Sequence, residues 1–598
     1  MSTEGDLTPA SQPDPVPPGV PAVAPVAHQP WYRRHRRLLI PAAAVLALGA
    51  LSAAAVLLLV KPNGTVEKMV PASADVIAVA NLDPSVTQKV NLLRAVHSFP
   101  DYKTDEAITD KLDQLLKDSD LSFSGDIQPW LGSEIGVSAR LNLVSTNDSP
   151  AAVYLVSRDD TKALAMLAKL RASKYGKKLQ WKDETYSGIT ISVGTPSNTT
   201  DKTAAYSYVD HVVVFATSSA QIHEIIDTDQ GRAPRLVDSN DYKATLAALP
   251  SDRLGFFYIN GKSLVAGVKK QMATTPALSL ALKNMNDVDA LQGIGATLSA
   301  NGDGLLADVL VKIDQSKLSP ATRETFAHAG RADAVVSWIP KASDAFLAIT
   351  SLNRSIQTVL DQSGNTASVK AGTDAVGLTG PGGVLPHLTG DAALEVEFGR
   401  TGLPAGAILL GTDNAQSMNA FFAKLLALAE GVAGSSFGGS GAGSGFGAPS
   451  AVTPPASHIT KTTYRSVVIT SWTSAMLGQL GAGDVFVPSY AVLDGMGILA
   501  STADEVKAII DAHKDGATIA SDPTYKTASA ASLAKPSAIV YVDIAKLVDV
   551  IRKSPLAPQA PLGAGSSLSA NIGPLKAMMM TTASESDRAA ERFFVIIR

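Results

Sequence analysis

The residues that could do chemistry fall into four short motifs, each with the side-chain types of a known kind of site. Gly434 to Gly438 fits G-x-S-x-G, which presents a nucleophilic serine when a strand precedes it and a helix follows it. Gly261-Lys262-Ser263 matches the end of a phosphate-binding loop, and Gly495-Met496-Gly497 fits a relaxed dinucleotide fingerprint. Ser532 and Lys535 have the S-x-x-K spacing of penicillin-recognising enzymes. These motifs would serve acyl transfer or nucleotide binding.

The surroundings of the motifs argue against each chemistry. Gly434 to Gly438 lies in a Gly/Ser-rich stretch, and Phe256 stands where a phosphate loop needs its first glycine. The glycines around Gly495 fall inside an apparent strand, and Ser532 has no convincing S-D-N or K-T-G companion. No H-E-x-x-H occurs, and no histidine of the body has another four residues away. We therefore predict no catalytic, cofactor-binding or metal site, and a protein that is not an enzyme.

The elements that would position such residues come in two copies, because two stretches of the chain nearly repeat each other at a constant offset of 284. The matched pairs include Tyr206 with Tyr490, Asp210 with Asp494, Ile222 with Val506, and Asp227 with Asp511. A period sustained over many residues marks a duplicated unit. We expect features shared by both copies to be architecture, and features of one copy to be decoration or function.

The pattern of apolar residues within each copy predicts an α+β unit. Short apolar runs at Val76 to Ala80 and at Ala345 to Ile349 predict buried strands. Tyr186 to Ile191 and Tyr464 to Ile469 predict one further strand in each copy. Hairpin-like pairs mixed with single helices favour an antiparallel or mixed sheet with helices on one face. A doubly wound parallel fold is the alternative, but Tyr206 to Phe215 leaves no room for its crossovers.

The polar residues shared by both copies have two interpretations. Asp210 and Asp494 lie between strands, where aspartate favours a turn. Asn260 and Asp543 end strands just before helices, where each can cap exposed amides. Paired carboxylates for acid/base work are the alternative. We predict the structural roles.

An uncharged segment from Leu38 to Val60 predicts a transmembrane helix, since about 20 apolar residues span a bilayer. The basic run from Arg33 to Arg37 precedes it and favours the cytoplasmic side, so the body after Lys61 is expected outside the membrane. A cleavable signal peptide with small residues at Ala53 to Ala55 is the alternative. We predict an uncleaved signal anchor.

The composition of the chain and its Pro-rich, basic and Gly/Ser-rich segments predict the domain organisation. The 598 residues include 51 Lys and Arg, 55 Asp and Glu and no Cys, so we expect neither disulfides nor nucleic-acid binding. The predicted parts are a disordered Pro-rich cytoplasmic tail at 1–32, the basic flank and signal anchor at 33–61, the first α+β repeat at 66–314, a linker at 315–334, and the second repeat at 335–598 with a flexible Gly/Ser-rich loop at 434–450.

Several short motifs carry a resemblance to a known family. They are Asn81-Leu82-Asp83-Pro84, Gln88-Lys89, Leu92-Leu93, Phe99-Pro100 and Trp130-Leu131-Gly132-x-Glu134. With these motifs the chain resembles the actinobacterial membrane-anchored proteins catalogued as domain of unknown function 3352. The resemblance implies location and architecture only. In the second copy Leu352-Asn353 replaces Asp83-Pro84 and Leu388 replaces Trp130, so these residues mark a difference between the copies.

The sequence therefore predicts a single-pass, membrane-anchored envelope protein with no enzymatic activity, whose repeats bind or scaffold a partner outside the cell membrane. Binding or carriage of a lipid or another apolar ligand is the second hypothesis, because a cleft between similar domains is a common ligand site. A hydrolase is the third. Asp83, Trp130 and Glu134 are the candidate functional surface. The partner is the membrane, together with an envelope protein or a lipid.

Overall fold

The computed structural model describes most of the chain from residue 64 onward. It covers residues 64–116, 119–141, 149–196, 203–274, 287–327, 330–362, 366–398, 405–436, 458–473, 486–553, 571–585 and 587–598. The predicted tail, basic flank and signal anchor, Leu38 to Val60 included, lie outside the described residues. Among the residues that are described, no helix is both long enough and apolar enough to cross a bilayer.

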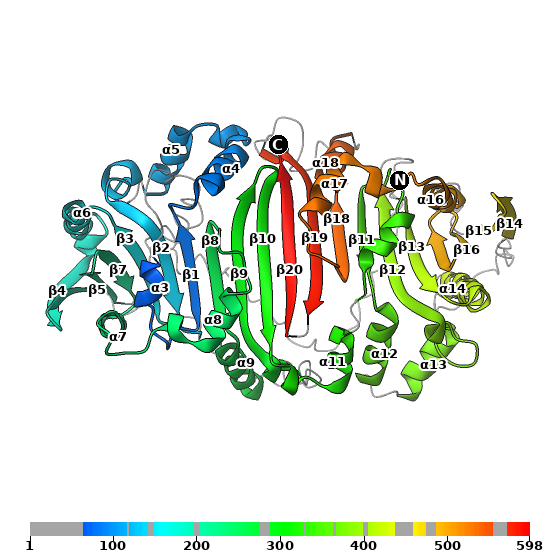
Figure 1. Ribbon diagram of the computed structural model, residues 1–598, viewed down its shortest axis with the longest axis horizontal. Coiled ribbons are helices and arrows are strands. Elements are labelled where there is room, and N and C mark those ends of the chain that lie inside the picture. The colour runs from blue at the N-terminus through cyan, green and yellow to red at the C-terminus, as the bar shows by residue number, and fades with distance from the viewer. Residues whose placement is uncertain are drawn as a thin grey trace, which may run out of the picture.

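The described strands form one antiparallel sheet of twenty strands, to which both copies contribute (Figure 1). In spatial order the first copy supplies β4 (Leu179–Tyr186), β5 (Ile189–Pro196), β6 (Ala204–Val209), β7 (Val212–Ala216), β3 (Ala151–Ser157), β2 (Leu131–Ala139), β1 (Val76–Asn81), β8 (Gly255–Asn260), β9 (Leu291–Asn301) and β10 (Gly304–Ile313). The second copy continues with β20 (Arg588–Ile597), β19 (Leu575–Glu585), β18 (Ala538–Val542), β11 (Ala345–Ile349), β12 (Leu388–Glu397), β13 (Ala405–Thr412), β17 (Met496–Ala500), β16 (Ser489–Leu493), β15 (Val467–Thr473) and β14 (His458–Tyr464). The α+β class and the antiparallel sheet are confirmed.

The two copies meet where β10 pairs with β20. Asp308 lies directly opposite Arg592, and these two residues are counterparts at the repeat offset of 284. β10 and β20 occupy the same place in the two copies and run antiparallel, so a local two-fold axis relates them. This axis passes through the point where a residue of one copy is paired with the residue at the same position of the other copy. The axis therefore passes between Asp308 and Arg592, whose Nε donates to Oδ1 of Asp308 at 2.6 Å. Lys312 with Asp587, and Arg598 with Asp303, form further ion pairs across this seam.

One face of the sheet is covered by helices along most of its width. In the first copy α3 (Thr65–Met69), α7 (Ser219–Asp229) and α8 (Asn240–Leu246) pack there, and in the second copy the 3-10 helix Ala332–Trp338, α16 (Ala503–Asp515) and α17 (Pro523–Ala530) do. Buried side chains such as Ile77 and Ile226 in one copy, and Phe346 and Ile509 in the other, fill these two cores. We call this the covered face.

The opposite face has helices mainly toward its two ends. At the first copy's end α5 (Asp105–Leu116) and α6 (Asp160–Ala172) enclose a core around Trp130 and Leu155. At the second copy's end α12 (Leu352–Gln362), α13 (Ala367–Ala375) and α14 (Ala415–Ser436) enclose one around Phe422. Between them α4 (Val86–His97), α9 (Gly261–Thr274) and α18 (Ile544–Lys553) lie along the upper and lower margins of the sheet in Figure 1.

Residues shared by both copies hold equivalent structural roles. The side chains of Asn260 and Asp543 accept hydrogen bonds from the backbone amides of Ser263 and Lys546 at 3.2 and 2.9 Å, which confirms the predicted helix caps. Asp210 has a positive φ of 40° in the turn between β6 and β7, and its counterpart has a φ of 45° between β16 and β17. The predicted turns are therefore confirmed as well.

Several sequence predictions are wrong in detail. Tyr186 to Ile191 and Tyr464 to Ile469 are not single strands, since each span contains a hairpin turn. Ser187 and Gly188 have positive φ in the first turn, as do Arg465 and Ser466 in the second, so the chain reverses there.

Other boundaries also differ from the prediction. Residues 434 to 436 end α14 rather than beginning a loop, and the rest of the predicted loop up to 450 lies outside the described residues. The predicted linker at 315–334 contains the helix α11 (Pro320–Ala327). The predicted match of Leu388 with Trp130 is also wrong by one residue. The strand partners of Leu388 and Leu131, which are Thr412 and Ser157, occupy equivalent places, so Leu388 is the counterpart of Leu131.

Candidate functional site

The three residues predicted as a functional surface are buried and lie in different environments. Asp83 is 9% exposed and forms an ion pair with Lys89 of α4. Trp130 is fully buried, and its Nε1 donates to the carbonyl oxygen of Asp126 at 2.6 Å. Each side chain therefore has a structural partner within the fold. A ligand-binding role for them stays a prediction.

Glu134 joins β2 to the first helix of the body. Its Oε1 accepts a hydrogen bond from the amide of Gly64 at 2.8 Å, and its Oε2 accepts one from the amide of Val66 at 3.0 Å. The first amides of a helix have no partner within the helix, and a carboxylate there satisfies them and faces the positive end of the helix dipole. Glu134 therefore fixes the N-terminus of α3 against the covered face of the sheet.

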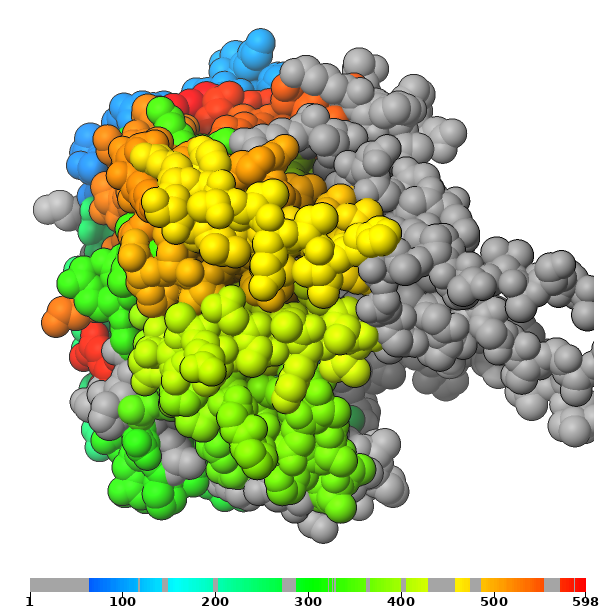
Figure 2. Space-filling view, turned by 90° about the vertical axis from the view of Figure 1, so that its right-hand side faces the viewer, coloured from blue at the N-terminus to red at the C-terminus, as the bar shows by residue number. Residues whose placement is uncertain are grey.

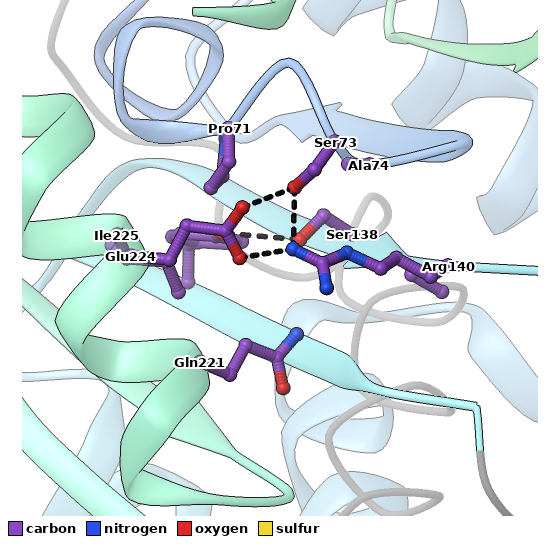
Figure 3. A pocket seen from close by; sticks show the side chains of 10 residues that line it. Pro71, Ser73, Ala74, Ser138, Arg140, Gln221, Glu224 and Ile225 are labelled. Atoms are coloured by element: carbon purple, nitrogen blue, oxygen red, sulfur yellow. Dashed lines mark hydrogen bonds and ion pairs between the residues drawn. The ribbon is translucent and has the colours of Figure 1, made fainter. Parts of the chain in front are cut away.

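A small pocket in the first copy brings polar side chains together (Figure 3). The Arg140 guanidinium forms an ion pair with Glu224 of α7 and donates to Ser73 Oγ at 2.6 Å, and Ser73 donates to Glu224. Beneath them Ser138 Oγ and the Tyr154 hydroxyl are 2.9 Å apart. The pocket has room for about one water molecule, so it suits a bridging water better than a substrate.

The second copy replaces this polar pocket with buried acids. Val76 pairs with Ala139, and Ala345 pairs with Val396, so Glu395 occupies the place of Ser138 and Glu397 that of Arg140. Glu505 of α16 takes the place of Gln221 at the repeat offset. Glu395, Glu397 and Glu505 are 0%, 8% and 1% exposed. This acidic cluster is a feature of one copy only.

The acidic cluster holds a proton at neutral pH. The Oε2 atom of Glu395 accepts a hydrogen bond from Ser343 Oγ at 2.9 Å. Burial, and next the charge of Glu505, raise the pKa of Glu395 to about 9. Because two carboxylates in contact inside the protein cannot both ionise, the pair shares a proton. Within the described part of the chain, no three histidine or acidic side chains are arranged to hold a metal ion.

The motifs considered in the sequence do not converge on a site. Gly261-Lys262-Ser263 forms the first turn of α9, which Asn260 caps. Gly497 lies inside β17, where an added Cβ would collide with Met418, so its role is close packing. Ser532 donates to the carbonyl oxygen of Ser529 at 2.7 Å, and Lys535 is exposed with a positive φ. In G-x-S-x-G, Gly434 to Ser436 are helical, with no strand leading into the serine.

The feature that stands out is an apolar row on the face opposite the covered one. Directly paired residues point to the same side of a sheet. One such row crosses eight strands in the order Ile408, Leu394, Leu347, Val540, Met580, Phe593, Ala307 and Leu298. We call this row, with its same-side neighbours Leu305, Val309, Met578 and Val595, the central apolar face.

The central apolar face is not buried. Leu298, Leu347, Leu394 and Ile408 are 38%, 37%, 46% and 44% exposed, and the residues between them in the row are half-buried. The alternate residues of the same strands, such as Phe594 and Met579, point to the covered face and are buried. An antiparallel sheet with one packed and one solvated face normally alternates apolar with polar residues. The central apolar face departs from this pattern, because its strands carry apolar side chains where a solvated face normally carries polar ones.

The sequence analysis predicted helices on one face of the sheet but did not identify the residues of the other face. The signal was present in runs such as Leu305 to Ala307 and Met578 to Met580, in which apolar residues do not alternate with polar ones. Such a run predicts a strand apolar on both sides, and only the register shows which side the helices leave exposed.

Comparisons with known proteins give a family and distant structural likenesses. Residues 39–432 match the family described as "Protein of unknown function (DUF3352)". No curated protein matches the chain. Crystal form III of TP0453 is 11% identical, with a TM-score of 0.23, over 46% of this chain and 87% of that one. Crystal form I of TP0453 is 10% identical, with a TM-score of 0.23, over 42% and 80%.

Proposed function

The chain belongs to the DUF3352 family of proteins of unknown function, and from that premise we propose that it is a membrane-anchored protein outside the cytoplasm that binds a lipid or similar apolar ligand on its central apolar face. The role is one of binding or carriage rather than catalysis.

The observation that carries this proposal is the exposed apolar row. Large exposed apolar patches mark interaction surfaces, because each apolar side chain removed from water stabilises a complex. The row from Leu298 to Ile408 crosses eight adjacent strands and is wide enough for an extended hydrocarbon chain, since neighbouring strands lie about 4.8 Å apart. Helices α4, α9, α18 and α12 lie along the margins of the sheet (Figure 1) and would give the ligand side walls.

The predicted anchor supports a ligand drawn from the membrane. Leu38 to Val60 is uncharged and follows the basic run from Arg33 to Arg37, and the described body begins at Gly64, directly after it. A body tethered so close to the bilayer would meet lipids at high local concentration. Accessibility of the body to protease in intact cells would test this topology, and full protection would contradict it.

The binding proposal is tested by lipid extraction and a matched pair of variants. Leu394→Glu places a charge in the row, whereas Ile459→Glu places one on β14, where Ile459 is 65% exposed and outside the face. Mass spectrometry of organic extracts should find a reproducible lipid with the wild-type full-length chain and with Ile459→Glu, and much less of it with Leu394→Glu. A clean wild-type extract, or equal lipid in both variants, would contradict the proposal.

A second candidate function, scaffolding of an envelope protein, rests on the edge of the sheet. Among the described strands, β14 pairs with β15 alone, and six of its seven residues are exposed at the end of the molecule seen in Figure 2. An unpaired strand edge can take an extended segment of another chain as an additional strand. Crosslinking from position 459 to one specific protein in cells would favour scaffolding over lipid carriage.

A further inference from the structure

The central apolar face is interrupted by one acidic residue. Glu591 lies on β20 directly opposite Val309 of β10 and Thr582 of β19, so its side chain points to the same side as theirs. Along its own strand Ala589 and Phe593 flank it on this side. A partly exposed carboxylate therefore lies amid the apolar row and its neighbours, close to the two-fold seam.

The Glu591 carboxylate has no partner among the residues that the structure describes. The adjacent Arg592 points to the covered face, where it binds Asp308 and the carbonyl oxygen of Ala531. Arg588 lies on that other side as well and pairs with Glu585. Among the described residues, Glu591 makes neither a side-chain hydrogen bond nor an ion pair, and no residue directly opposite it is charged.

Comparison of the copies shows that this charge belongs to the second copy alone. The counterpart of Glu591 at the repeat offset is Ala307, which lies in the apolar row. A carboxylate is poorly suited to an apolar surface unless a cation or a hydrogen-bond donor accompanies it, because apolar surroundings disfavour its charge. The asymmetry therefore gives the face a carboxylate at Glu591, while the equivalent position in the first copy, Ala307, is apolar.

We infer that the ligand of the central apolar face is an amphiphile whose polar end carries a protonated amine, which Glu591 binds while the hydrocarbon lies along the row. This inference rests on the proposed function and names the class of its ligand. A protonated amine donates charge-assisted hydrogen bonds to a carboxylate, whereas a fatty-acid carboxylate at the same place would be repelled. The neighbouring Thr582 hydroxyl can accept from the same amine.

The test compares three probes of equal chain length. Dodecylamine, dodecanol and dodecanoate, each below its critical micelle concentration, are titrated into the full-length chain at pH 7 by isothermal calorimetry. We expect the amine to bind most tightly and the carboxylate most weakly. Glu591→Gln should weaken amine binding about tenfold and leave dodecanol unchanged, since a charge-assisted hydrogen bond is worth about twice a neutral one. Glu585→Gln, an exposed neighbour in the hairpin, should change neither.

The mirror variant Ala307→Glu adds a carboxylate at the equivalent place in the first copy, and it should strengthen amine binding or add a second amine site. Equal binding of all three probes by the wild type, or an unchanged amine preference in Glu591→Gln, would overturn the inference while leaving apolar binding intact. Failure of all three probes to bind would overturn the proposed function and this inference together.

Discussion

Replacement of Glu395 by Gln should make the stability of the protein less dependent on pH. In the folded chain Glu395 is fully buried, and burial together with the Glu505 charge raises its pKa from 4.5 to about 9. In the unfolded chain the Glu395 carboxyl group is solvated, and its pKa returns to the ordinary value. The folded state therefore binds a proton that the unfolded state has already released at neutral pH.

The sign and size follow from this difference in proton binding. The contribution of protonated Glu395 to the free energy of unfolding is fully present below the unfolded pKa of 4.5, and it is lost as the pH rises toward the folded pKa. Within that window the free energy of unfolding falls by up to about 1.4 kcal/mol per pH unit. Between pH 5 and pH 8 the wild-type chain should lose up to about 4 kcal/mol through this group.

Gln cannot ionise, so Glu395→Gln should remove this slope. The variant is expected to be close to the wild type at pH 5 and more stable at pH 8. Urea unfolding followed by circular dichroism at four pH values measures both slopes. Glu324→Gln is a suitable control, because Glu324 is on the surface and its side chain is 65% exposed. Equal slopes in wild type and Glu395→Gln, or a variant less stable at pH 8, would refute the reasoning.

Three further substitutions test the structural roles. Asp308→Ala leaves Arg592 without its buried partner and should lower the free energy of unfolding by roughly 2–4 kcal/mol in urea, while the exchanged pair Asp308→Arg with Arg592→Asp should recover most of the loss. Glu134→Ala should speed amide hydrogen exchange in α3, at a stability loss of about 2 kcal/mol, and unchanged exchange would argue against the cap. Asn260→Ala should cost about 1 kcal/mol of stability without altering ligand retention; lost retention in a fully stable variant would contradict a purely capping role.

Local chemistry was predictable from the sequence where one short segment determines it. Asn260 and Asp543 cap helices because a strand end, an Asx side chain and a helix start follow one another within a few residues. The wrong interpretation of Tyr186 to Ile191 has an equally local cause. Ser187 accepts a positive φ that its type rarely adopts, so only Gly188 signalled the turn.

Long-range features could not be predicted in the same way. The junction of β10 with β20 joins residues 284 positions apart, and no local pattern states which edge strands will pair. The acidic cluster needs β12 and α16 to come together, so Glu395 and Glu505 look like ordinary surface acids in the sequence. The prediction of a functional surface at Asp83 and Trp130 rests on a difference between the copies, and such a difference does not report burial.

The Asp308 and Arg592 pair makes the two repeats chemically distinct at the seam where β10 pairs with β20. If the first copy associated with another first copy through β10, the same axis would bring two aspartates together, and two second copies would bring two arginines together. Only the mixed pair neutralises its charges. The seam therefore discriminates against pairing of two like repeats and favours pairing of a first repeat with a second one.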